Sequence, residues 1–210
     1  MIMNDVTLSI DDQDNVKLVE APGEKEIREA LFSLNIDSVV GSDGFTNKFF
    51  MFNWDIVHEE VINVVREFFV HASMTYGANS NFISLIPKKD NSVDIKDFRP
   101  FLIGNTIPKV ISKIISTRLG NMVKGLITPN KIGFVLERNI QTCIFTASEC
   151  INVMRRKVKQ GNLAVKIDIS KDFDTMKWRF IFSILRMHGF YIRLTNLVHA
   201  ILKSARLSIL

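Results

Sequence analysis

One segment, residues 163–178, constrains the fold of this chain more than any other. It reads LAVKIDISKDFDTMKW. Its apolar residues alternate along the first half, at Leu163, Val165, Ile167 and Ile169. Alternation with a period of two predicts a β-strand that buries one face. Asp168 then lies on the opposite face of that strand, where its carboxylate can point into a cleft.

The residues around Asp168 have a distinctive spacing. Lys166 precedes it, Phe173 follows five positions later with Asp174 directly after, and Trp178 closes the segment. This pattern resembles the first catalytic motif of reverse transcriptases of the non-LTR (LINE-type) retrotransposons, K-x-D-x-x-K-A-F-D-S-x-x-W. The resemblance implies that Asp168 binds the catalytic metal, Mg²⁺ or Mn²⁺, and that Phe173 screens the sugar of the incoming nucleotide. Carboxylate oxygens suit such hard cations, which assist phosphoryl transfer in pairs.

Each of these residues also has a simpler interpretation. Asp168 alone would more often cap the turn after a strand, and Phe173 alone would fill a core. A helical pattern follows Asp174, so we expect that residue to be a helix N-cap rather than a metal ligand.

Two basic motifs precede this segment in the order that the same family has. They are LIPKK at 85–89 and DFRP at 97–100. The resemblance implies that Lys88, Lys89 and Arg99 hold the phosphates of the incoming nucleotide. The chemistry is suitable, because arginine offers a planar fork to phosphate oxygens and lysine a point charge. Without the resemblance, these residues are solvated charges of a turn.

Two more motifs extend the resemblance. In VGSDGF (40–45), Gly41 and Gly44 are expected to serve the backbone, since glycine tolerates a positive φ. In GFVLERNI (133–140), Arg138 is expected to face the template or primer backbone, or else to be an ordinary surface arginine. Seven further basic residues either form a wider surface for nucleic acid or are solvated charges on helix faces. They are Lys109, Lys113, Arg118, Arg155, Arg156, Lys157 and Lys159.

The expected fold is α/β (α+β), with helices packed on a small incomplete sheet, as in the fingers and partial palm of a right-hand polymerase. Residues 1–22 are expected to be a loose lead-in, 23–160 the fingers-like part and 161–210 the partial palm. Apolar periodicity predicts helices at 24–34, 54–71, from 108 onward, 140–159, 178–188 and 191–204, with strands at 82–89, 163–169 and from 206. The helix at 140–159 is expected to turn Ile144, Ala147, Ile151 and Met154 inward.

Composition indicates which general classes of protein this chain can belong to. A hydrophobic fraction of 47% supports a sizeable core, and the net charge of +5 suits a polyanionic partner without requiring one. Cys143 and Cys150 are expected to be buried, reduced thiols rather than a disulfide. No apolar run is long enough for a bilayer and the start lacks the features of a signal peptide. We therefore expect an intracellular protein of the cytoplasm or nucleus, with no membrane contact.

The resemblance spans about Glu24 to Leu210 and implies a fragment of an RNA-directed DNA polymerase, a nucleotidyltransferase that uses an RNA template, a DNA primer and deoxynucleotide triphosphates. No hairpin with a pair of Asp residues follows Asp168, so we expect residues 1–210 alone to be catalytically incomplete. The alternatives are a non-catalytic nucleic-acid-binding remnant and a decayed element product without activity. Departures from the family pattern at Val40, Glu137 and Asp172 favour the last.

Overall fold

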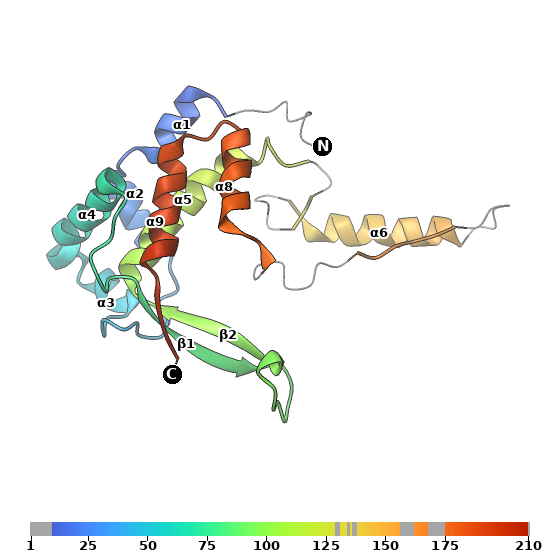
Figure 1. Cartoon of the computed structure of the whole chain (residues 1–210), viewed down its shortest axis with the longest axis horizontal. Helices are drawn as coiled ribbons and strands as arrows, with labels where there is room; N and C mark the ends of the chain where they lie inside the picture. Colours follow the sequence, from blue (N-terminus) through green and yellow to red (C-terminus); the bar gives the residue numbers. More distant parts are fainter. Residues whose placement is uncertain are drawn as a thin grey trace. The chain divides into compact units, whose positions relative to one another are not determined.

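A computed structural model describes residues 10–128, 131–133, 135, 138–155, 162–167 and 175–209. The chain divides into two compact units. One comprises Met1–Ile10 and Gly120–Gly189, and the other, which we call the larger unit, comprises Asp11–Leu119 and Phe190–Leu210. Helices and a small sheet both occur, so the expected mixed α/β class is confirmed (Figure 1).

Helices make up most of the larger unit, and their apolar stripes form its core. The spacing of Ile27 and Leu31 on α2, and of Val65 and Phe68 on α4, puts these side chains on one helical face, and all four are buried. The helices are α1 (Asp12–Val19), α2 (Glu24–Phe32), α3 (Asn47–Phe52), α4 (Trp54–His71), α5 (Thr106–Val123, whose last turn passes into the other unit) and α9 (Ile192–Ser204).

Helix α1 lies inside the segment that the sequence analysis expected to be a loose lead-in. Asp11 caps it, because its carboxylate accepts a hydrogen bond from the backbone N–H of Asp14 at 2.7 Å. Leu18 is fully buried. Asn15 is also buried, and its Oδ1 accepts a hydrogen bond from the N–H of Tyr191 at 2.7 Å. A short helix anchored by one leucine and one amide has almost no periodic signal in its sequence.

The sheet has three strands in the order β2-β1-β3, namely β1 (Ser80–Pro87), β2 (Phe98–Gly104) and β3 (Arg206–Ile209). β1 and β2 form an antiparallel hairpin that pairs Ile86 with Arg99 near its tip and Asn81 with Gly104 at its base. A 3₁₀ turn, η1 (Ile95–Asp97), leads into β2. β3 runs parallel to β1. The strands expected in FISLIPKK and from 206 onward are confirmed.

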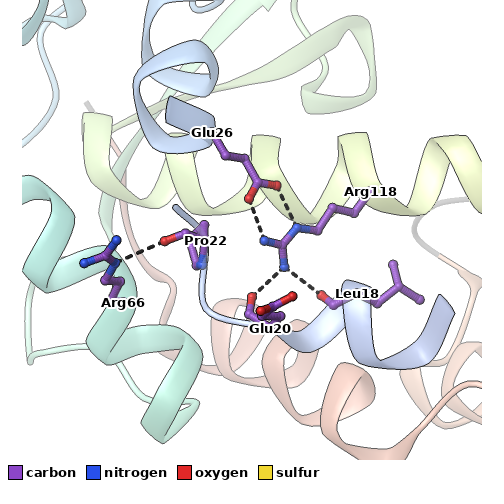
Figure 2. A network of polar contacts seen from close by, with 6 residues as sticks. All are labelled: Leu18, Glu20, Pro22, Glu26, Arg66 and Arg118. Carbon is purple, nitrogen blue, oxygen red and sulfur yellow. Dashed lines mark hydrogen bonds and ion pairs between the residues drawn. The ribbon is translucent and has the colours of Figure 1, made fainter. Parts of the chain in front are cut away.

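Arg118 of α5 binds α1, α2 and the connection between them (Figure 2). Its Nε and Nη2 atoms donate to the two carboxylate oxygens of Glu26 at 2.7 and 2.6 Å, and Nη1 donates to the backbone carbonyls of Leu18 and Glu20. Its guanidinium also lies 5.2 Å from the ring centre of Phe69. The expectation that Arg118 belongs to a basic surface is therefore wrong, because every arm of its side chain is already used.

The other unit contains α6 (Ile140–Met154) and α8 (Trp178–Met187). The structure corrects three expectations here. Helix α6 ends at Met154, and Ile144 and Ile151 are exposed rather than inward. Its two cysteines, Cys143 and Cys150, are likewise exposed rather than buried. The buried strand expected at 163–169 is not formed by its described part, residues 162–167, where Val165 and Ile167 are exposed. An apolar pattern specifies which side chains share a face, but burial also needs a partner surface.

Across the residues that the structure describes, every helix is too short or too polar to span a bilayer.

Candidate functional site

The β1–β2 hairpin gathers the basic residues of the two sequence motifs at one end. Lys88 and Lys89 directly follow β1, and Arg99 is the second residue of β2. The ladder continues past the strands, because the N–H of Lys88 donates to the carbonyl of Asp97 at 2.8 Å. The two motifs, with seven residues between them in the sequence, therefore converge at the hairpin tip.

The two lysines are restrained by local contacts. The ammonium of Lys88 donates to the carbonyl of Lys96 at 2.7 Å. Lys89 forms an ion pair with Asp97, with 3.2 Å between its Nζ and the carboxylate Oδ1. The Asp97 side chain is only 19% exposed, whereas that of Lys89 is 64% exposed. Exposed ion pairs contribute little, about 0–1 kcal/mol. These contacts orient the lysines but are weak enough to be exchanged for a stronger anion.

Arg99 differs from the two lysines in having a side chain without a bonding partner among the described residues. It is exposed, and among the described residues its guanidinium makes no hydrogen bond or ion pair. Strand pairing places it opposite Ile86, so its backbone is fixed while its fork remains available. A guanidinium in this state is suited to bidentate binding of phosphate.

The catalytic segment itself is only partly described. Asp168, Phe173 and Asp174 lie outside the described residues, so the structure does not relate them to the hairpin. Their flanking motif residues, Lys166 and Trp178, are both exposed. Among the described residues, no group of three His, Cys, Asp or Glu side chains lies close enough together to hold a metal ion.

Two of the three arginines expected to contact nucleic acid are described. Arg138 donates to backbone carbonyls, including those of Thr128 at 2.6 Å, Ile127 at 2.9 Å and Lys131. Arg138 therefore organises the chain that follows α5. Arg155, at the end of α6, is exposed, and its guanidinium has no partner among the described residues. Arg156 lies outside them.

The VGSDGF turn fixes the base of the hairpin, and its glycines are structural as expected. Gly44 has a φ of +81°. Gly41 packs so closely that an added Cβ would lie 2.3 Å from Oδ1 of Asn105. That amide oxygen accepts from the Ser42 hydroxyl at 3.1 Å, and the amide nitrogen donates to the carbonyl of Ala78 at 3.0 Å.

The buried asparagines at this base had not been identified from the sequence. Asn79, Asn81 and Asn105 are each at most 6% exposed and are held by side-chain hydrogen bonds. Polar residues next to strand ends are common in turns, so the sequence offered no signal that these three amides are buried.

Comparison with known proteins supports the family resemblance that the hairpin motifs indicated. Residues 86–207, more than half of the chain, match the family "Reverse transcriptase (RNA-dependent DNA polymerase)". The chain belongs to this family. The matched residues begin near the hairpin tip and end within β3.

The relatives of this chain are proteins of transposable elements. It is 27% identical over 165 residues to the "Transposon TX1 uncharacterized 149 kDa protein" of Xenopus laevis, a match that covers 79% of this chain and 12% of that protein. It is 22% identical over 169 residues to the "Retrovirus-related Pol polyprotein from type-1 retrotransposable element R2" of Nasonia vitripennis, covering 80% and 16% respectively. The chain thus spans less than a fifth of either relative. The expected kinship with non-LTR reverse transcriptases is confirmed.

Proposed function

We propose that this chain contributes the nucleotide-gripping hairpin and the first catalytic carboxylate of an RNA-directed DNA polymerase. Residues 23–160 would supply the fingers-like part and residues 161–210 part of the palm. The observation that carries this proposal is Arg99, exposed and unpaired on a strand, beside Lys88 and Lys89 at the hairpin tip. An RNA template, a DNA primer and deoxynucleotide triphosphates are the corresponding partners.

The hairpin's role is to bind and orient the triphosphate of the incoming nucleotide. Arg99 would contact two phosphate oxygens through its fork. Lys88 and Lys89 would exchange their present partners, the carbonyl of Lys96 and the carboxylate of Asp97, for phosphate oxygens. A triphosphate carries more charge than either partner, so the exchange is favourable. The exposed strand end keeps these groups accessible.

Asp168 and Phe173 would act at the other end of the nucleotide. A carboxylate is the right donor for Mg²⁺ or Mn²⁺, so Asp168 would hold a metal ion, which supplies charge neutralisation at the phosphates when bound. Phe173 would pack against the sugar. These two assignments rest on the motif spacing around Asp168.

Nucleotide binding tests the hairpin directly. We expect a fluorescent deoxynucleotide triphosphate to bind the 210-residue chain and Arg99→Gln to weaken this binding about tenfold, equivalent to about 1.4 kcal/mol, because one charge-assisted contact is lost. Arg28→Gln is the matched control, since Arg28 stacks on Phe32 of α2 and lies away from the hairpin. Equal binding by the Arg99→Gln variant and the unmodified chain would contradict the proposal.

Primer extension on an RNA template tests the catalytic part. We expect residues 1–210 alone to incorporate no nucleotide with Mg²⁺ or Mn²⁺, because residues 169–210 contain no two adjacent Asp residues to complete the metal site. Template-dependent incorporation that disappears in Asp168→Ala would show that one carboxylate motif is enough.

A second candidate function is nucleic-acid binding without catalysis, which the exposed and unpaired Arg155 favours. This function would show as salt-dependent binding of RNA or DNA, because released counterions drive such binding. It would survive Asp168→Ala and weaken when Arg99, Arg155 and Arg156 are changed to glutamine.

A further inference from the structure

A cavity of about 540 Å³ lies within the larger unit, at the base of the hairpin. It is bounded by the ends of β1 and β2 and by helices α5 and α9. Its volume is in the range of small-molecule sites, which are typically about 300–1,000 Å³. Several apolar side chains line it and offer a surface for a flat ring; these residues are Leu34, Leu102, Pro108, Ile201, Leu202 and Ala205.

Two lysines of α5 line this cavity. Lys109 and Lys113 are four residues apart and therefore share one helical face. Neither makes a hydrogen bond or ion pair with a described residue, and the described residues that line the cavity include no acidic one. Lys109 also borders a second cavity of about 380 Å³. Of these two cavities, Lys113 lines only the one of about 540 Å³. The pair is therefore oriented toward the larger cavity.

The arrangement of these lysines favours an anion in the cavity. Like charges at i and i+4 on a helix repel each other. Burial lowers the pKa of Lys109, although the nearby carboxylate of Asp43 raises it. That carboxylate already accepts a hydrogen bond from the N–H of Phe45 at 3.0 Å. A phosphate in the cavity would relieve both the repulsion and the cost of burial.

An unused hydrogen-bond acceptor completes the cavity. Asn81 is 5% exposed, and its amide nitrogen donates to the carbonyl and side-chain oxygens of Asn79. Its own Oδ1 accepts no hydrogen bond from a described residue. That oxygen lies over Gly104, which also lines the cavity, and a Cβ on Gly104 would come within 2.2 Å of it. Glycine at this position leaves room for this amide oxygen, an acceptor that suits the N–H group of a base.

We propose that this cavity binds a phosphate-bearing nucleotide. The base lies between the apolar walls and donates an N–H to Oδ1 of Asn81, while Lys109 and Lys113 hold the phosphate. The site lies apart from the hairpin tip, because Gly104 follows Arg99 by five residues of strand, or roughly 16 Å. The ligand is either a free nucleotide or one unit of a single strand, and the chemistry is the same. This proposal goes beyond the proposed function and does not depend on polymerisation.

Binding measurements without divalent metal test this site. The probes are a nucleoside monophosphate, a short single-stranded oligonucleotide and inorganic phosphate. One of the two nucleotide probes should bind the unmodified chain. We expect the double variant Lys109→Gln/Lys113→Gln to bind that probe at least tenfold more weakly. Lys25→Gln is the control, because Lys25 is almost fully exposed on α2 and is paired with Glu29. It should change binding less than twofold.

Several outcomes are decisive. Preference for the oligonucleotide would identify a strand as the ligand, and preference for the monophosphate a free nucleotide. Equal binding by the double variant and the control would overturn the site, as would inorganic phosphate binding as tightly as either nucleotide probe. If Arg99→Gln weakens triphosphate binding but the double variant does not weaken binding of any probe, the hairpin proposal stands and this one fails.

A second measurement uses the unmodified chain and therefore requires no substituted variant to fold. The ε-methylene NMR signals of Lys109 and Lys113 should shift when the nucleotide is added, whereas that of Lys25 should not. Unchanged signals from both lysines at saturating nucleotide would contradict the site.

Discussion

Arg118 binds Glu26 through two parallel hydrogen bonds of 2.7 and 2.6 Å, although 92 residues separate them in the sequence. The Arg118 side chain is 13% exposed and that of Glu26 is 37% exposed. The same guanidinium also holds the carbonyls of Leu18 and Glu20, and Arg66 holds that of Pro22 at 3.1 Å (Figure 2). Two arginines thus fix the connection between α1 and α2.

Loss of this arginine should destabilise the larger unit. We expect Arg118→Ala to lower the free energy of unfolding by about 2–4 kcal/mol, because it leaves a carboxylate and two carbonyls unpaired. Arg118→Lys should recover only part of this loss, since an ammonium lacks the planar fork. Urea denaturation followed by circular dichroism measures both effects. Lys25→Ala, at an exposed position of α2, should change the unfolding free energy by less than about 0.5 kcal/mol.

The burial of Leu18 makes a second prediction about α1. Leu18→Ala should lower the free energy of unfolding by about 2–4 kcal/mol, because it removes a fully buried side chain and leaves a cavity. Val16→Ala on the same helix should cost far less, since Val16 is exposed. Equal effects of the two substitutions in urea would mean that α1 does not pack on the rest of the unit.

The turn at the base of the hairpin should tolerate no side chain at Gly41. Gly41→Ala should cost about 1–3 kcal/mol, because its Cβ would meet the side chain and backbone of Asn105 at 2.3–2.9 Å. Gly23→Ala is a matched control: an added Cβ there meets no atom within 4 Å. Thermal unfolding of the two variants compares them, and a similar melting temperature would argue against the close contact.

The half-buried Lys109 should make stability depend on pH. The pKa of Lys109 is lowered by burial, so between the folded pKa and the unfolded value of 10.5 the unfolded chain binds more protons and stability rises with pH. Lys109→Met should therefore stabilise the chain at neutral pH, and its advantage should shrink as the pH approaches 10.5. Urea midpoints between pH 7 and pH 10 measure this difference. A constant advantage over this range would show that Lys109 ionisation is not the cause.

The sequence predicted best where a residue acts through its own local chemistry. The apolar spacing of Ile27, Ala30 and Leu31 was sufficient for α2, and the glycines of VGSDGF were recognised as structural. The basic motifs of the hairpin were also found in advance. In each case the signal lies within a few neighbouring positions.

Prediction failed where the partner is distant. Arg118 was grouped with surface cations, because nothing near it in the sequence indicates Glu26. Asn15 meets the backbone of residue 191, and Asn105 meets that of Ala78. For residues 163–167 the alternating pattern was correct as a description of the sequence, but no described strand pairs with them.

The contact of α1 with Tyr191 bears on how the protein forms during synthesis. The hydrogen bond from the Tyr191 N–H to Asn15 joins positions 176 residues apart. A ribosome extends the chain by about 5–20 residues per second, so α1 emerges many seconds before its partner does. The Asn15 side chain therefore lacks this partner until translation has passed residue 191.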